Sequence, residues 1–398
     1  MKRQILHIDV NNAFLSWTAV ARLKRGETVD LRNIPSVVGG DESQRHGVVL
    51  AKSNIAKQFG IKTGEPIYQA RKKCPSIVVV PGEHEMYRIY SDNLYKLFCE
   101  YTDKIERFSI DECFLDMTEF IRPGEDVLKK AIEIKERVKK EFGFTVNIGI
   151  SDDKILAKMA SDFEKPDKIH TLYKSEIEEK MWKLPVNELF MVGRKSINKL
   201  ERLGIKTIGD LAKKDPKVLI KSFGKYGFMI WNYANGNSNE EINFQEVRPK
   251  GIGNSITLPY DYSTIEELYP VLVRLTEQVA YRLRKENMLA TVVNVQLKNS
   301  NFEVYSHQKK LPHRTDTSKE ILSTAKELLQ ELYKGDKIRL IGIRVDGLCE
   351  KEEIQISIFD EKEEDKSKKI DKTIDLLKEK YGYGMIKKAG ELNKQKKD

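Results

Sequence analysis

The chain has 398 residues, and this length exceeds the usual size of one hydrophobic core and predicts two to four domains. Hydrophobic residues make up 40% of the chain, which is enough to fold them. A formal net charge of +9 favours a polyanionic partner, although many basic proteins bind no nucleic acid. The four cysteines form no C-x-x-C pair, which argues against a metal knuckle or a disulfide framework. No apolar stretch has the length of a membrane span, and a charge interrupts the first apolar run where a signal peptide needs its core. A cytoplasmic protein is therefore expected.

The N-terminal part of the chain alternates between strand-like and helix-like patterns. Strands are predicted at residues 4–10, 36–38, 48–53, 106–117 and 145–150. Helices are predicted at residues 12–25, 84–104 and 125–142. This alternation predicts a ferredoxin-like α/β domain with a small inserted module near its start.

The pattern changes beyond residue 165. Residues 166–235 carry several short helices and little strand signal, whereas residues 236–247 are polar and aperiodic and predict a linker. The next elements follow the order β-α-β-β-α-β, at residues 251–258, 264–286, 291–298, 302–310, 317–333 and 337–345. The remaining tail is rich in charge and is interrupted by the apolar segment Ile354 to Phe359.

Two short acidic stretches are the most informative feature of the chain. Asp9 in I-L-H-I-D-V and Asp111-Glu112 in S-I-D-E each lie at the end of an apolar, strand-like run, so a sheet could bring three carboxylates together around two divalent ions. In a regular strand Asp111 and Glu112 point to opposite faces, so both serve one site only if S-I-D-E turns or bulges. The competing interpretation is that these acids are solvated loop residues.

Two further motifs give the acids a recognisable context. Lys57 lies in A-K-S-N-I-A-K-Q-F-G, and Lys165-Pro166 follows the run G-I-S-D-D-K-I-L-A-K. With these motifs, residues 4 to 348 resemble the Y-family, or translesion, DNA polymerases. Within this family the chain resembles both bacterial DNA polymerase IV and the catalytic subunit of DNA polymerase V. Two segments, Ser53 to Lys57 and residues 191–207, look closer to the polymerase V subunit.

The resemblance implies an α+β multidomain chain with the right-hand architecture of a polymerase. It comprises a ferredoxin-like palm, small fingers, a helical thumb with a helix-hairpin-helix, and a βαββαβ little finger. By this resemblance the palm is residues 1–10 and 76–165, the fingers 11–75, the thumb 166–235, the linker 236–247, the little finger 248–348 and the tail 349–398.

The resemblance also implies a two-metal mechanism. Asp9, Asp111, Glu112 and the backbone carbonyl of Val10 are expected to bind two Mg²⁺ ions, for which hard oxygen donors are suited. The expected reaction is error-prone, template-directed transfer of a nucleotide from dNTP to the primer 3′-hydroxyl. Many relatives carry a second Asp at position 11, where this chain has Asn.

The incoming nucleotide is expected to meet Phe14, which falls where the family has an aromatic steric gate against the 2′-hydroxyl; the competing interpretation is a core aromatic residue. Backbone N–H groups of Asn11 to Phe14, at a helix start, are expected to face the phosphates. Two substitutions depart from the family, because Asn54 and Lys57 stand where many relatives have Tyr and Arg. The expected triphosphate-binding residues are Asn11, Asn12, Ala13, Phe14, Ser53, Asn54, Lys57 and Lys165.

Primer-template DNA is the expected macromolecular partner. Residues 189–211 resemble a helix-hairpin-helix that aims backbone N–H groups at a DNA phosphate, although Met191 replaces its first glycine. In the little finger, residues 291–298 alternate apolar and polar side chains, which predicts a sheet with helices on one face and a basic open face. The expected DNA-binding residues are Gly193, Arg194, Lys195, Lys298, Lys309, Lys310 and Arg314.

The tail contains Gln355-Ile356-Ser357-Ile358-Phe359, which resembles the peptide that binds the bacterial sliding clamp (the β subunit). Gln355, Ile358 and Phe359 are the expected clamp contacts. The competing interpretation is a further edge strand of the little finger. Residues 370–392 predict a pair of short helices of unassigned role, and a monomer is expected.

Two other functions are consistent with parts of the pattern. The altered fingers residues Asn54 and Lys57 leave open a catalytically weak scaffold that binds DNA and the clamp. A nucleotide cyclase on a related palm is a third possibility, although it has no need of the predicted thumb and little finger. Primer extension with Mg²⁺ and four dNTPs separates the three functions.

Overall fold

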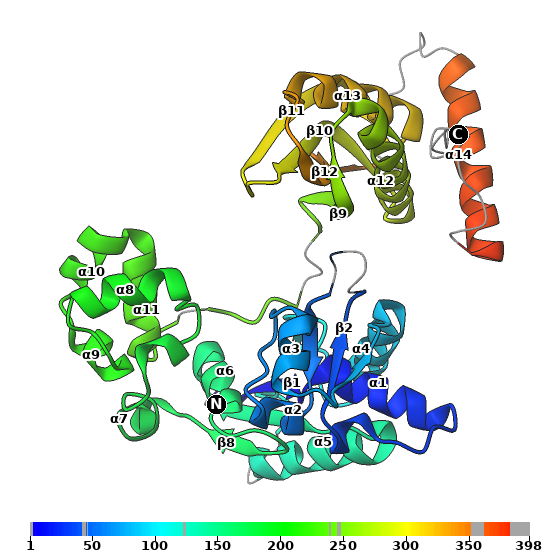
Figure 1. The fold of residues 1–398 in the computed structure, drawn as a ribbon. Coiled ribbons are helices and arrows are strands. Elements are labelled where there is room, and N and C mark those ends of the chain that lie inside the picture. Colours follow the sequence, from blue (N-terminus) through cyan, green and yellow to red (C-terminus); the bar gives the residue numbers. More distant parts are fainter. Residues whose placement is uncertain are drawn as a thin grey trace. The chain divides into compact units, whose positions relative to one another are not determined.

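The computed structural model describes residues 3–41, 45, 47–121, 125–238, 240–244, 248–351 and 362–382. The chain divides into two compact units, residues 1–40 with 47–246 and residues 41–46 with 247–398 (Figure 1). The first unit contains both acidic stretches. The second contains the predicted β-α-β-β-α-β segment.

A five-stranded sheet forms the centre of the first unit, in the order β5-β6-β1-β7-β8. Its strands are β1 Ile5–Val10, β5 Ile105–Arg107, β6 Glu112–Asp116, β7 Val146–Ser151 and β8 Ile169–Thr171. The central strand β1 is buried along its whole length and runs antiparallel to β6 and β7. Because side chains alternate along a strand, β1 presents two different faces.

The two faces of β1 pack against different helices. Leu6, Ile8 and Val10 join the core made with α1 Ala13–Lys24, α4 His84–Phe98 and α5 Val127–Phe142. Ile5 packs instead with Ala157 of α6 Lys154–Asp162, and His7 contacts Ser161 of the same helix. Asp9 follows in this second series. The alternation therefore directs the first acid to the face that α6 covers.

A three-stranded sheet of order β3-β2-β4 forms the inserted module. Its elements are β2 Ser36–Gly39, β3 Val49–Lys52, α2 Asn54–Gln58, α3 Ile67–Lys73 and β4 Val78–Val80. Two predicted boundaries are wrong here. Residues 78–80 pair with β2 although the palm was predicted to resume at residue 76, and β8 pairs with β7 although the palm was predicted to end at residue 165. Strands of three residues are too short to reveal a period.

Short helices follow, as the sequence predicts. They are α7 Ile177–Lys180, α8 Arg194–Arg202, α9 Ile208–Lys213, α10 Pro216–Phe223 and α11 Lys225–Ala234, and they enclose their own apolar core. The described part of residues 236–247 contains no helix or strand. It is nevertheless anchored, because Ile242 is buried against Ile5, Phe114 and Ala157.

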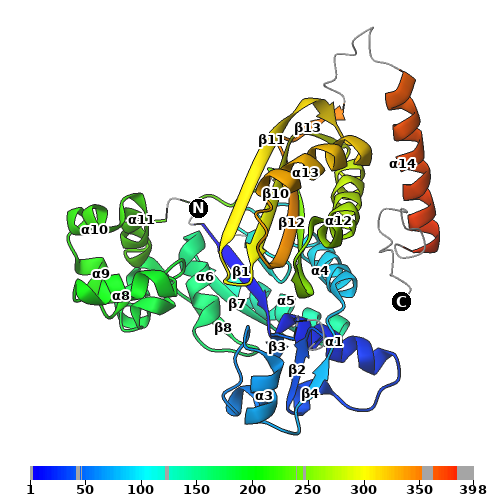
Figure 2. The ribbon, with the colours of Figure 1, turned by 45° about the horizontal axis from the view of Figure 1, so that its top comes forward.

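The second unit has the predicted β-α-β-β-α-β order. Its elements are β9 Gly251–Tyr262, α12 Ile265–Lys285, β10 Met288–Asn299, β11 Val304–Thr315, α13 Ser318–Leu332 and β12 Ile338–Asp346. The antiparallel sheet has the order β11-β10-β12-β9, and both helices pack on one face (Figure 2). Val293, Val295 and Leu297 are fully buried beneath the helices, as their alternation predicts.

A further helix, α14 Lys362–Tyr381, packs on this unit. The Arg284 guanidinium of α12 binds Asp375, with Nη2 to Oδ1 at 2.9 Å, and its Nη1 lies 3.3 Å from Oδ2 of Asp371. Lys378 and Glu277 form a second, buried ion pair. The predicted helix at residue 370 thus begins eight residues earlier and is docked, whereas its predicted partner beyond Gly382 and the clamp motif Gln355 to Phe359 lie outside the described residues.

Candidate active site

The three predicted carboxylates line one cavity. Glu112 stands directly opposite Asp9 in the pairing of β6 with β1, and Asp111 lies in the turn just before β6. The N–H groups of Phe108 and Ser109 both donate to the Glu112 carbonyl, and Ser109 Oγ donates to Asp111 Oδ1 at 2.6 Å. The sequence S-I-D-E therefore turns, as required. All three acids face a cavity of about 330 Å³ that Val10 and Phe14 also line.

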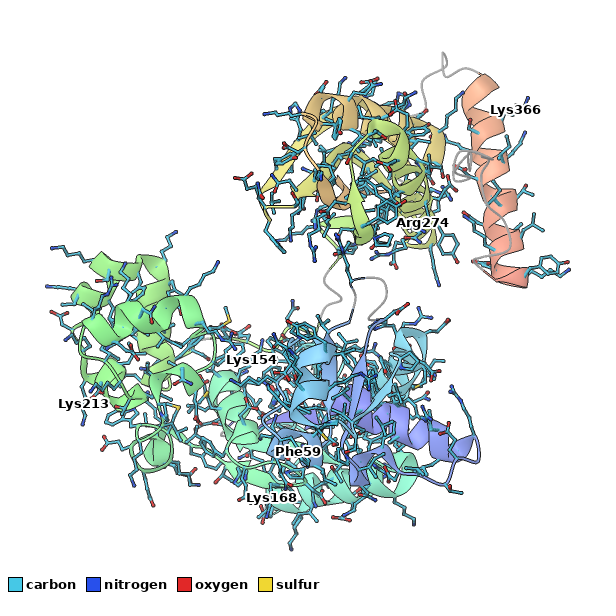
Figure 3. The ribbon with its side chains drawn as sticks, in the orientation of Figure 1. Phe59, Lys154, Lys168, Lys213, Arg274 and Lys366 are labelled. Carbon is cyan, nitrogen blue, oxygen red and sulfur yellow. The ribbon has the colours of Figure 1, made fainter. Side chains whose placement is uncertain are left out.

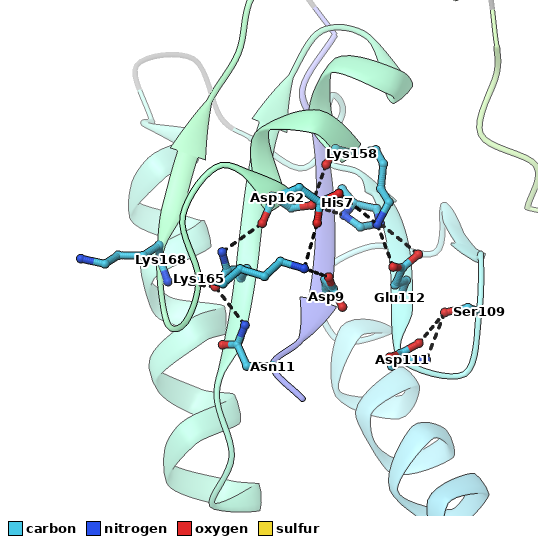
Figure 4. Close-up of polar contacts among 12 residues, drawn as sticks. His7, Asp9, Asn11, Ser109, Asp111, Glu112, Lys158, Asp162, Lys165 and Lys168 are labelled. Atoms are coloured by element: carbon cyan, nitrogen blue, oxygen red, sulfur yellow. Dashed lines mark hydrogen bonds and ion pairs between the residues drawn. The ribbon is translucent and has the colours of Figure 1, made fainter. Parts of the chain in front are cut away.

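Two lysines neutralise two of the acids (Figure 4). Lys165 donates to Asp9 Oδ2, and Lys158 of α6 donates to Glu112 Oε1 at 2.7 Å. Asp162 joins the lysines, with Oδ1 at 2.8 Å from Lys165 Nζ and Oδ2 at 3.6 Å from Lys158 Nζ. The result is a continuous chain of alternating charges from Glu112 to Asp9.

Burial and these contacts shift the pKa values in opposite directions. Burial raises the pKa of Asp9 to about 6, against the opposing charge of Lys165. Burial also tends to raise the pKa of Glu112, but the neighbouring His7 ring and the Lys158 ammonium outweigh it and lower that pKa to about 2. His7 Nε2 lies 3.8 Å from Glu112, too far for a hydrogen bond, so Lys158 is the main support. Burial lowers the pKa of His7 to about 4, which keeps its ring neutral near pH 7.

The donor set fits a hard divalent cation. Three carboxylates on one cavity offer the oxygen ligands that Mg²⁺ prefers, and Val10 also lines this cavity. Among the described residues, no three acidic, His or Cys side chains are drawn together as a closed metal cluster. The reason is visible in the contacts, because Asp9 and Glu112 each turn an oxygen toward an ammonium and Asp111 turns one toward Ser109.

A second cavity of about 170 Å³ adjoins the first. Its lining contains three lysines and no acid: Asn11, Asn12, Lys52, Ser53, Asn54, Lys57, Lys165 and Pro166. Asn12, Lys52 and Lys165 line both cavities. The predicted residues Ser53, Asn54, Lys57 and Lys165 thus meet at one place. Lys165 is paired with Asp9 and Asp162, whereas the cavity lining supplies no acid to Lys52 or Lys57. Such a cluster of cations is suited to a polyphosphate.

Lys52 is a site residue that the sequence prediction missed. It ends β3 and lies next to the α2 N-cap Ser53, whose Oγ accepts from the Ala56 N–H at 3.0 Å. Burial, followed by the charge of Lys57, lowers the pKa of Lys52. Its place at the end of a predicted strand, between two expected site segments, was the available signal, but only the fold shows that it lines both cavities.

Phe14 lies at the rim of the first cavity on the first turn of α1. Its ring stacks on Tyr87 at a centroid distance of 4.7 Å, and Tyr87 is itself buried. One prediction about this segment is wrong. The backbone N–H of Asn11 donates to the carbonyl of Thr145 at 3.0 Å, so it is not directed at a phosphate, because residue 11 still continues the ladder between β1 and β7.

The predicted hairpin lies before α8. Gly193 caps the helix, and Gly193, Arg194 and Lys195 are all exposed at its N-terminal end. Met191 has a φ of 71°, in the left-handed region that glycine favours. Met191 therefore takes up the backbone conformation for which a glycine was expected.

The predicted basic face of the second unit needs one correction. Lys309 pairs with Val293, whose side chain lies beneath the helices, and Lys309 accordingly forms an ion pair with Glu327 of α13. Lys310 is the next residue along β11, so it points to the opposite, open face, where Lys298 also lies. Lys309 is therefore wrongly assigned to that face, because the strand register was not known.

Within the described residues, no helix is both long and apolar enough to cross a membrane.

Comparisons with known proteins agree on one family. Residues 8–162 match the family model described as the impB/mucB/samB family, and residues 249–358 match its C-terminal domain. DNA polymerase IV of Clostridium acetobutylicum is 48% identical over 397 residues, covering 100% of both chains. DNA polymerase IV of Acetivibrio thermocellus is 36% identical over 394 residues, covering 98% of this chain and 97% of its own.

Solved structures show the same likeness. A Y-family DNA polymerase chimera of Dbh and Dpo4 has a TM-score of 0.78 and 25% identity, covering 87% of this chain and 99% of its own. An insertion ternary complex of Dbh DNA polymerase has a TM-score of 0.61 and 25% identity over 86% of this chain and 98% of its own. The full-length relatives named above are polymerases IV, and the likeness of residues 53–57 to polymerase V stays a prediction.

Proposed function

The chain belongs to the Y-family DNA polymerases, and from this premise we propose that it is an error-prone, template-directed DNA polymerase for translesion synthesis. One observation carries the proposal. Asp9, Asp111 and Glu112 line one cavity, and this cavity adjoins a second cavity that is lined by three lysines. Carboxylates for metals beside cations for a triphosphate are what nucleotidyl transfer requires.

Asp9, Asp111 and Glu112, with the Val10 carbonyl, hold two Mg²⁺ ions. When bound, the ions lower the pKa of the primer 3′-hydroxyl and neutralise charge that develops on the triphosphate. The protein's own part is to present the three carboxylates on one cavity from a rigid sheet and a hydrogen-bonded turn. Ser109, through its 2.6 Å bond to Asp111, supports that turn.

The triphosphate binds along Lys57 and Lys165, with Lys52 as a third cation and Ser53 and Asn54 beside them. The three lysines around the second cavity support this assignment. Lys52 also compensates for the arginine that many relatives have in place of Lys57, because its additional positive charge offsets the loss of the bidentate guanidinium group. The N–H groups of Asn12, Ala13 and Phe14, at the start of α1, complete the phosphate site.

Phe14 serves as the steric gate, with its ring against C2′ of the incoming sugar. Its stacking on buried Tyr87 supports this role, since this contact restricts rotation of the Phe14 ring away from a 2′-hydroxyl. Deoxynucleotides are therefore the preferred substrates.

The protein binds DNA through its phosphates, without reading the base sequence. Backbone and side-chain donors at Gly193, Arg194 and Lys195 bind one phosphate strand, and their exposure at the start of α8 supports this role. Lys298, Lys310 and Arg314 bind further phosphates through charge. Lys309 is left out because of its ion pair with Glu327.

The remaining expectations stay proposals. The domain boundaries are those predicted from the sequence, with two shifts: residues 78–80 join the fingers and residues 166–171 join the palm. The protein acts as a monomer in the cytoplasm and binds the sliding clamp through Gln355, Ile358 and Phe359.

The test is primer extension by the full-length protein with Mg²⁺ and four dNTPs, on an undamaged template and on one with an abasic site. We expect extension on both templates, with insertion opposite the lesion. Tight DNA binding with no extension on either template would instead favour a damage-tolerance scaffold that binds DNA and the clamp. Extension that stops before the lesion would contradict translesion synthesis alone.

A further inference from the structure

Helix α6 lies unusually close to the sheet that carries the acids. A Cβ atom added to Gly149 of β7 would stand 2.0 Å from the carbonyl oxygen of Ala157, so glycine is required for this approach. The apolar residues of α6, from Ile155 to Ala160, are buried. The helix is therefore a rigid platform, and the side chains that it directs at the sheet are held in place.

Two lysines one turn apart on this platform each bind an acid of the sheet. Lys154 donates to both oxygens of Glu106 at 2.8 Å, and Lys158 donates to Glu112 Oε1 at 2.7 Å. Their side chains are similarly buried, with exposed fractions of 7% and 9%. They differ in the acid that they hold, because Glu106 lines neither of the two cavities and Glu112 lines the larger one.

Lys158 is fixed from three directions. Its ammonium lies 3.6 Å from Asp162, which in turn binds Lys165 at 2.8 Å. Its backbone carbonyl accepts from Ser161 Oγ, and the same Oγ lies 2.8 Å from His7 Nδ1 on β1. His7 Nε2 has no hydrogen-bond partner among the described residues, so Lys158 alone makes a hydrogen bond to the Glu112 carboxylate from this side.

We propose that Lys158 is a positioning residue for nucleotidyl transfer: it holds the Glu112 carboxylate through Oε1, and Asp162 links it to Lys165 at the triphosphate. The inference rests on the proposed role of Glu112 as a metal ligand. Residues that hydrogen-bond to a metal ligand and orient it can change the reaction rate by a large factor, because a metal site is efficient only when each ligand is correctly oriented. Lys158 is not required to touch the ions or the substrates.

The test compares Lys158→Met with the matched control Lys154→Met on the same helix. Lys158 is labelled in Figure 4 and Lys154 in Figure 3. Both changes remove a buried ammonium and leave one partly buried acid without its lysine. At saturating Mg²⁺ we expect Lys158→Met to lower kcat by about 10- to 100-fold while the KM for nucleotide stays within about threefold. Lys154→Met should keep kcat within about twofold of the parent, because Glu106 takes no part in the site. Lys158→Arg, which keeps the charge, should recover part of the loss.

A second readout does not depend on turnover. Mn²⁺ is titrated by electron paramagnetic resonance into the protein with a dideoxy-terminated primer-template and dNTP. We expect Lys158→Met to bind Mn²⁺ within about threefold of the parent, because the three ligands remain and one competing cation is gone. A loss of kcat that excess Mg²⁺ restores, an unchanged kcat, or an equal loss in Lys154→Met would each overturn the inference.

Glu112→Gln, measured alongside, separates the inference from the site on which it rests. If Glu112→Gln extends primers normally, the assignment of Glu112 as a metal ligand fails. If Glu112→Gln is inactive and Lys158→Met is normal, the site stands and only the positioning role of Lys158 fails.

Discussion

Glu112 lies directly opposite Asp9 in the antiparallel register of β6 and β1. This pairing brings together two acids that are about a hundred residues apart in the sequence, and the turn before β6 adds Asp111 to the same cavity. The pairing is set by a buried strand, so the backbone positions of the two acids are fixed next to each other.

Replacement of any of the three acids by Ala should abolish extension. We expect a loss of about a thousandfold or more in kcat, since each change removes a metal ligand from the chemical step. DNA affinity, measured by fluorescence anisotropy, should stay close to that of the parent, because none of the acids contributes to the DNA grip. Near-normal extension by Asp111→Ala would refute the proposed site.

Phe14→Ala should admit ribonucleotides. The clash with the 2′-hydroxyl disappears while the acids remain, and Tyr87 is too deeply buried behind the gate to replace it. Single-nucleotide insertion of a dNTP and the matching ribonucleotide measures the discrimination. If the ratio of kcat/KM for the two substrates does not change, the gate lies elsewhere.

Lys52→Ala, Lys57→Ala and Lys165→Ala should each weaken nucleotide use. We expect a raised KM if the charge acts on the bound triphosphate and a lowered kcat if it acts on the leaving pyrophosphate. Loss of one point charge at a phosphate should cost about 1 to 3 kcal/mol in kcat/KM. Lys73→Ala is a suitable control on the fingers, because Lys73 forms an ion pair with Glu65 and lines neither cavity. If Lys52→Ala behaves like this control, Lys52 is not part of the triphosphate site.

Lys310→Ala should weaken DNA binding more than Lys309→Ala. Each phosphate contact that is lost should reduce the slope of log affinity against log salt by about one unit. Lys309 is the neighbouring residue on the opposite face and is engaged by Glu327, which makes it a matched control. Equal losses from the two variants, measured over a range of salt concentrations, would mean that the open face of the sheet does not bind DNA.

Changing Ile358 and Phe359 together to Ala should cost about 2 to 4 kcal/mol of sliding-clamp affinity, because the pair would supply the apolar anchor of the peptide. Clamp-stimulated processivity should disappear while extension without the clamp is unchanged. Direct titration of clamp by calorimetry provides the measurement. Parental affinity in the double variant would leave the motif with a structural role.

Local patterns were sufficient for the longer elements and for the identity of the three acids. The apolar runs before Asp9 and around Asp111 predicted strands that end in acids, and the alternation of Val293, Val295 and Leu297 predicted one buried face. Such signals are local because backbone pleat and helical period act on neighbouring residues. Even the turn at S-I-D-E followed from a local argument, since two adjacent acids on a flat strand could not share one cavity.

The sequence by itself therefore determined the longer strands and helices and the identity of the three acids, Lys57 and Lys165, whereas the short elements β4, β8, α2 and α3 were not predicted. The tertiary structure alone decided which face each long-range neighbour occupies: Lys158 beneath Glu112, Lys52 between two cavities, Lys309 beside Glu327, and α14 on α12. Strand register and helix docking bring together residues that are far apart in sequence. These contacts depend on how whole elements pack, and no periodicity within one segment encodes its partner.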